Sequence, residues 1–81
     1  MARRLAEDLK GSFELVVRRY QHALFTAGLR WSARAQEAEE IAQEAFVRAY
    51  EALSTYAPKR IAELRLRPWL LKIALNSFVT S

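Results

Sequence analysis

The segment from Gln36 to Leu53 most constrains the fold, because its apolar residues recur at three- and four-residue steps without a glycine or proline. Residues at these steps share one face of an α-helix, whereas the apolar residues of a half-buried strand would alternate. The apolar positions are Ala38, Ile41, Ala42, Ala45, Phe46, Ala49 and Leu53. The small alanine side chains on this face allow another helix to approach closely. The sequence therefore predicts a long amphipathic helix that packs against a second helix.

An earlier segment has the same periodicity and predicts the partner helix. Its apolar face consists of Phe13, Val16, Val17, Tyr20, Leu24, Ala27 and Trp31. We expect this helix to begin near Ser12, which would cap it after Gly11, and the connection to the next helix to span 31–35. Residues 1–11 form either a short leading helix or a frayed arm.

Two prolines organise the last part of the chain. Pro58 lacks a backbone donor and biases its predecessor away from helix, so Ser54–Ile61 is expected to be irregular. Pro68 suits a first helical position, and a third helix is expected around it. Its apolar residues are Trp69, Leu70, Ile73, Ala74 and Phe78. Leu64 and Leu66 are assigned to a short helix just before it.

The overall composition predicts one small helical domain. The chain has 81 residues with two glycines and two prolines, and no alternating pattern typical of a strand. We expect an all-α fold, a compact three- to four-helix domain with its core in residues 12–78. The absence of cysteine excludes disulfides and zinc–thiolate sites. No apolar run approaches the ~20 residues of a membrane span, and residues 1–8 do not resemble a signal peptide, so we expect a cytoplasmic location.

Charge is distributed unevenly along the chain, whose net charge is +4. The segment 36–53 carries five glutamates and one arginine, whereas 59–72 carries five basic residues and one glutamate. Two different partners would produce this pattern, and so would a helical bundle with uneven surface charge. Composition alone does not distinguish these interpretations.

The chain lacks the usual signs of an enzyme. His22 is the one histidine and has no placed acid or thiol partner. The glutamates of the acidic segment lack the histidines of a carboxylate-bridged metal site, and there is no glycine-rich phosphate loop. We therefore expect no catalytic residue, no metal and no cofactor.

The acidic helix has a polar face opposite its alanine-rich face. Its members are Glu40, Gln43, Glu44, Val47 and Glu51, linked by three- and four-residue steps. Pattern alone favours a solvated polar face. The functional alternative is a docking surface for a basic partner helix.

The basic segment contains residue types that suit nucleic acid. Lys72 and Asn76 are four residues apart, and Arg65 joins them if the helix extends through Pro68. Lysine contacts phosphates, asparagine reads base edges, and Tyr56 has a ring on which an unpaired base could stack. The structural alternatives are a solubilising lysine, an asparagine at a helix end and a tyrosine that closes the core.

Three motifs resemble region 2 of the sigma-70 family of RNA polymerase sigma factors, most closely the extracytoplasmic-function (ECF) group. The segment 37–50, EAEEIAQEAFVRAY, resembles the signature helix of that region. The segment 13–20, FELVVRRY, resembles its opening helix, and 69–76, WLLKIALN, its closing helix. The three motifs occur in the family's order, and the resemblance spans about 12–78.

The resemblance implies two binding activities. Region 2 docks on the clamp helices of the polymerase beta-prime subunit, and it recognises and helps open the −10 promoter element by capturing unpaired non-template bases. The polymerase contacts it implies are Glu40, Gln43 and Glu44, with Val47 on the same face; the family more often has aspartate in place of Glu40. The DNA contacts are Tyr56, Lys59 and Arg60 in the loop 54–67, followed by Arg65, Arg67, Lys72 and Asn76.

Some features depart from the family. The stretch 64–68, LRLRP, replaces a glycine- and phenylalanine-containing stretch of many members, so the base pocket is expected to be built differently. Family members continue into a second, helix-turn-helix domain that reads the −35 element. We expect 1–81 to be a single region 2 domain without it, unable to direct normal transcription from a two-element promoter.

Two other functions remain open at this point. The chain could be a helical protein-interaction module held by an anti-sigma regulator, without independent DNA binding. It could also bind duplex DNA as a stand-alone helix-turn-helix protein, although no clear pair of helices joined by a short turn supports this.

Overall fold

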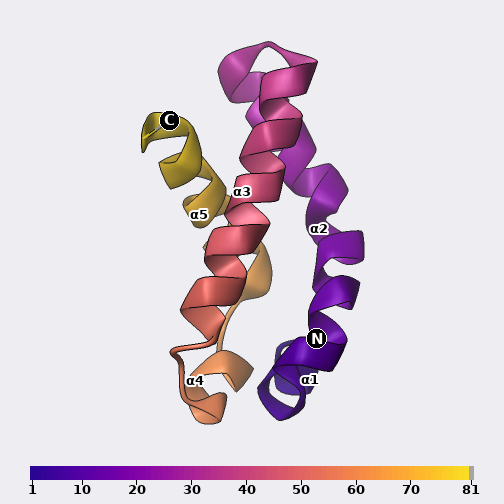
Figure 1. The fold of residues 1–81 in the computed structure, drawn as a ribbon, viewed down its shortest axis with the longest axis vertical. Coiled ribbons are helices and arrows are strands. Elements are labelled where there is room, and N and C mark those ends of the chain that lie inside the picture. Colours follow the sequence, from indigo (N-terminus) through magenta and orange to yellow (C-terminus); the bar gives the residue numbers. More distant parts are fainter. Residues whose placement is uncertain (81) are drawn as a thin grey trace.

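The computed structural model describes residues 1–80, which fold into five α-helices around one core (Figure 1). The helices are α1 (Ala2–Glu7), α2 (Leu9–Ser32), α3 (Ala35–Leu53), α4 (Pro58–Ala62) and α5 (Leu66–Thr80). The long helices α2 and α3 run in opposite directions, and α5 packs against both. The all-α prediction is confirmed, with five helices because 2–7 and 58–62 are also helical. The expected end of the domain at Ser81 lies outside the described residues.

The first long helix begins earlier than predicted. Its N-cap is Asp8, whose carboxylate accepts a hydrogen bond from the Gly11 amide at 3.0 Å. Ser12 lies inside the helix, where it is 3% exposed and its hydroxyl reaches the carbonyls of Arg4 and Asp8. Serine and aspartate are both good N-caps, so residue type does not choose between Asp8 and Ser12. The turn between α1 and α2 makes Asp8 the N-cap of α2.

The turn from α2 to α3 depends on a residue in the left-handed conformation. Ala33 has a φ of 61° and donates its amide to the Leu29 carbonyl at 2.8 Å, which ends α2. Ser32 adds a hydroxyl hydrogen bond to the Gly28 carbonyl at 2.8 Å. A left-handed C′ residue is a common helix ending, but it is usually glycine. The connection is therefore shorter than the predicted 31–35, and α3 begins one residue before the predicted Gln36.

The alanine-rich face of α3 is buried, as its periodicity predicts. Ala38, Ala45 and Ala49 are all 0% exposed. Opposite Ala38, α2 presents Gly28, where an added Cβ would lie 3.1 Å from the Ala38 Cα. Small residues on both helices thus bring the α2 and α3 backbones close together.

The prolines act differently from the prediction. Pro58 lies at the start of α4, so the irregular stretch is confined to residues 54–57. Pro68 is the third residue of α5, which begins at Leu66, while Leu64 lies in the connection between α4 and α5. The first helical turn has no intrahelical use for its amides, so it accepts proline at either position.

The core includes residues from both short helices. Leu5 of α1 is 0% exposed and Ile61 of α4 is 3% exposed, and both belong to one cluster with Val16, Phe46 and Leu70. The helix α1 packs on α4 at one end of the molecule (Figure 1). Residues 2–7 thus form a docked helix. None of the helices within 1–80 combines the length and apolar character needed to cross a membrane.

Candidate functional site

The polar residues of α3 form a continuous exposed face. Glu40, Gln43, Glu44 and Glu51 are all exposed, and Val47 retains 60% of its surface. They project away from the buried alanines because three- and four-residue steps keep them on one side of the helix. The predicted face therefore exists and is accessible. An apolar valine in its middle gives it the mixed character of a protein-binding surface.

Glu44 is held by a residue that the sequence analysis did not single out. The Arg48 guanidinium lies 2.9 Å from its carboxylate and 3.4 Å from the Thr80 hydroxyl at the end of α5. The two side chains of the ion pair retain 40% and 46% of their surface, so the pair contributes only about 0.3–0.5 kcal/mol to stability. The spacing of four residues from Glu44 to Arg48 was the available signal for it.

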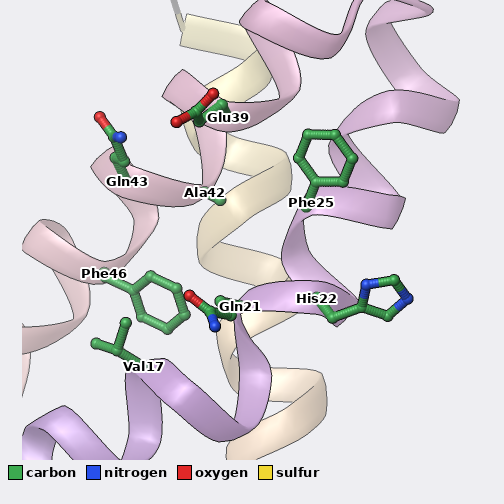
Figure 2. Close-up of a pocket in the computed structure, with 8 residues that line it drawn as sticks. All are labelled: Val17, Gln21, His22, Phe25, Glu39, Ala42, Gln43 and Phe46. Carbon is green, nitrogen blue, oxygen red and sulfur yellow. The ribbon is translucent and has the colours of Figure 1, made fainter.

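A hollow of about 420 Å³ opens between α2 and α3 beside Gln43 (Figure 2). Its lining combines apolar side chains with polar ones from the two facing helices, Val17, Phe25, Ala42 and Phe46 with Gln21, His22, Glu39 and Gln43. His22 also borders it, but Figure 2 shows its ring directed away from α3. A partly apolar depression thus lies beside the acidic face of α3, at Gln43.

The structure distributes the predicted DNA-binding residues over two helices and the connection that precedes each of them. Tyr56 lies in the 54–57 connection, Lys59 and Arg60 in α4, Arg65 immediately before α5, and Arg67, Lys72 and Asn76 in α5. All the charged residues and Asn76 are exposed. The α5 helix does extend through Pro68, with the Trp69 amide donating to the Arg65 carbonyl at 3.1 Å.

Arg67 differs from the other predicted DNA-binding residues because it lines a hollow beside α2. Arg19, Arg30 and Trp31 of α2 line the same hollow. Positive charge therefore continues from α5 onto α2, which the sequence analysis missed because the residues are distant in the chain.

Tyr56 is half-buried and makes two ring contacts. Its ring centroid lies 6.1 Å from that of Trp69. The Arg60 guanidinium carbon lies 3.9 Å from the Tyr56 ring centroid, which is a cation–π contact. The tyrosine is thus both packed against the core and covered by an arginine.

The described residues contain no arrangement typical of metal binding. Within 1–80 no group of three or more histidine, aspartate and glutamate side chains is placed to hold a metal ion. His22, the histidine considered above, is exposed at the margin of two hollows.

The Sigma-70 region 2 family model matches residues 16–81. The chain belongs to this family. Among curated proteins it is similar to the RNA polymerase sigma-H factor of Pseudomonas aeruginosa, 35% identical over 77 residues, which are 95% of this chain and 38% of that protein. It is also similar to the RNA polymerase sigma factor NccH of Alcaligenes xylosoxydans xylosoxydans, 30% identical over 76 residues, 94% of this chain and 39% of that one. No solved structure gives a significant match.

The chain thus spans less than two fifths of each of these relatives. The resemblance seen in the motifs 13–20, 37–50 and 69–76 is confirmed at the level of the family. These motifs lie in α2, α3 and α5, the three helices that form the body of the domain.

Proposed function

We propose that this sigma region 2 domain takes part in transcription initiation by docking on core RNA polymerase through α3 and contacting −10 promoter DNA through α4 and α5. The single observation that carries the proposal is the separation of charge onto two accessible surfaces. The face with Glu40 and Glu44 is acidic, whereas Lys59, Arg60 and Lys72 are exposed on other helices. One surface suits a basic protein helix and the other a phosphate backbone.

The docking contacts of the proposal are Glu40, Gln43, Glu44 and Val47, against the clamp helices of the beta-prime subunit. Carboxylates supply charge, the glutamine amide adds directional hydrogen bonds, and Val47 buries apolar surface.

Glu44→Lys tests this surface, and Glu14→Lys is a matched control. Both substitutions reverse one exposed carboxylate and break an i,i+4 ion pair with arginine, at 2.9 Å for Glu44 and 3.1 Å for Glu14. We expect Glu44→Lys to weaken binding to core polymerase about tenfold or more, and Glu14→Lys to leave it unchanged. Equal affinities of the two variants in a fluorescence titration would refute α3 as the docking surface.

The DNA part of the proposal concerns the non-template strand of the −10 element. Opening DNA costs about 1.4 kcal/mol per base-pair step, and stacking a base on one aromatic returns about 1–3 kcal/mol. Contacts by Tyr56, Lys59, Arg60, Arg65, Arg67, Lys72 and Asn76 would therefore stabilise one or two captured bases. The polymerase would hold the rest of the bubble, and we expect the domain to act in the cytoplasm.

The DNA test compares single-stranded and duplex oligonucleotides bound to the complex of the chain with core polymerase. We expect preference for the single strand and a steep loss of affinity with salt. Equal binding of both forms would contradict strand capture.

The exposed apolar side chains favour a second candidate, a protein-interaction module bound by an anti-sigma regulator. Besides Val47, α5 exposes Leu75 at 42% and Val79 at 69%. A regulator that covers these residues would bind with little salt dependence, which separates it experimentally from DNA.

A further inference from the structure

The arrangement of Trp69, Tyr56 and Arg60 determines which side chain an incoming base would contact first. The tyrosine is half-buried and belongs to the residues packed against the core, as does Trp69. Arg60 is exposed, and its guanidinium carbon lies 3.9 Å from the Tyr56 ring centroid. The group that faces solvent at this point is therefore a planar cation, with an aromatic ring behind it.

The backbone fixes this arrangement. Arg60 follows Tyr56 by four residues across the start of α4, where the Arg60 amide donates to the Ala57 carbonyl at 3.0 Å. Pro58, at the first position of the same helix, restricts the chain between the two side chains. The tyrosine ring thus contacts the guanidinium, and Arg60 as a whole remains exposed to solvent.

The charge of Arg60 is also not engaged in either ion pair found within residues 1–80. One pair joins Arg18 to Glu14 and the other Arg48 to Glu44. Its nearest charged neighbour along α4 is Lys59, which is also cationic. The planar face can therefore stack while the edge of the guanidinium donates to an anionic group such as a phosphate.

We propose that Arg60, supported by Tyr56, presents the surface on which an unpaired base of the non-template strand stacks. This inference rests on the proposed DNA-binding function and changes the role of Tyr56 from base platform to positioning residue. Arginine planes stack on unpaired bases in single-stranded recognition, and every base has a π-face, so this contact tolerates different bases. Sequence preference would then come from other groups, such as Asn76.

Two substitutions of Arg60 distinguish the contribution of its planar stacking surface from that of its charge. Arg60→Lys keeps the charge and loses the plane, while Arg60→Gln keeps a planar amide and loses the charge. The measurement is the affinity of the complex with core polymerase for a fluorescent single strand selected from a random pool by the parent complex. We expect about a tenfold loss for Arg60→Lys with an unchanged salt slope.

Abasic strands make the test specific for stacking. Removing the captured base from the strand should cost the parent about tenfold in affinity and cost Arg60→Lys nearly nothing, because the stacking partner is already absent. Tyr56→Phe should retain binding, since the ring is kept, whereas Tyr56→Leu should reproduce the lysine phenotype. The fluorescence quenching of 2-aminopurine at the captured position should be retained in Tyr56→Phe and lost in Arg60→Lys and Tyr56→Leu. A loss of protein stability alone would not produce this pattern of quenching.

Lys59→Ala is the matched control on the same helix. It removes a neighbouring exposed charge and should lower the salt slope without changing the abasic penalty. Parental affinity of Arg60→Lys would overturn the inference by reducing Arg60 to a phosphate contact. Tighter binding by Arg60→Ala would overturn it by making Arg60 a cover over Tyr56. Failure of the parent complex to bind any single strand would instead refute the proposed function.

Discussion

The close crossing of α2 and α3 makes Gly28 a sensitive position. A Cβ at Gly28 would lie 3.1 Å from the Ala38 Cα and 3.3 Å from the Ala38 carbonyl oxygen. Carbon atoms prefer separations of about 3.5–4.0 Å, so relief requires a shift of a few tenths of an ångström. Because the two closest of the contacted atoms are backbone atoms, α3 itself must move, and side-chain rotation cannot remove the clash.

Two opposing effects determine the stability of Gly28→Ala. Alanine is favoured over glycine inside a helix by about 1 kcal/mol. Overpacking a tight core contact costs about 1–3 kcal/mol, and here the whole alanine-rich face of α3 is buried against its neighbours. We expect a net loss of about 1 kcal/mol in the free energy of unfolding. For a domain of this size that lowers Tm by roughly 4–8 °C.

The assay is urea unfolding followed by far-UV circular dichroism, with thermal unfolding as a second measure. Gly28→Ala/Ala38→Gly should not recover the parental stability, because Ala38→Gly removes only the Cβ and leaves the closer Cα and carbonyl oxygen in place. Gly28→Leu should lose more than Gly28→Ala. If Gly28→Ala were as stable as the parent or more so, the helices could separate at no cost and the packing argument would be wrong.

Substitutions at three further positions test other parts of the fold. Ala33→Gly should raise the free energy of unfolding by about 0.5–1 kcal/mol, because alanine is strained at a φ of 61°; an unchanged urea midpoint would contradict this. Asp8→Ala should lower the free energy of unfolding by about 1 kcal/mol, because the hydrogen bond that caps the Gly11 amide is lost. Asp8→Ser should retain most of the parental free energy of unfolding in the same assay. Leu5→Ala should cost about 2–5 kcal/mol since Leu5 is 0% exposed, and a value near zero by calorimetry would show that α1 is not docked.

Periodicity was sufficient to predict α3 and most of α2 because each helix buries one face along its length. It failed at Ser12, where two residues of good capping type compete and tertiary structure chooses Asp8. It also failed at Pro58, because a proline that breaks one helix can begin the next. Both errors concern the exact residue at which a helix begins, which a local sequence pattern does not determine.

The candidate site was predictable where it follows one helix. Glu40, Gln43 and Glu44 share a face because of their spacing alone, and their exposure agrees with that. The contact of Arg48 with Thr80 and the joint hollow of Arg67 with Arg19 and Arg30 depend on how helices distant in the chain pack. The cation–π contact of Arg60 with Tyr56 depends on the path of the chain from residue 54 to 60, which residue spacing does not determine.

The packing of α1 on α4 has a consequence for how this domain could be handled or regulated. The helix that carries Lys59 and Arg60 has only five residues, too few to be stable alone, and its one buried residue, Ile61, shares a core with Leu5. The stability of α4 and of the 54–57 connection before it therefore depends on α1, which lies about fifty residues earlier in the sequence. A fusion tag, a fluorophore or a bound protein that displaces α1 would therefore destabilise α4 and the connection before it. It would do so without contacting any residue that is proposed to bind DNA.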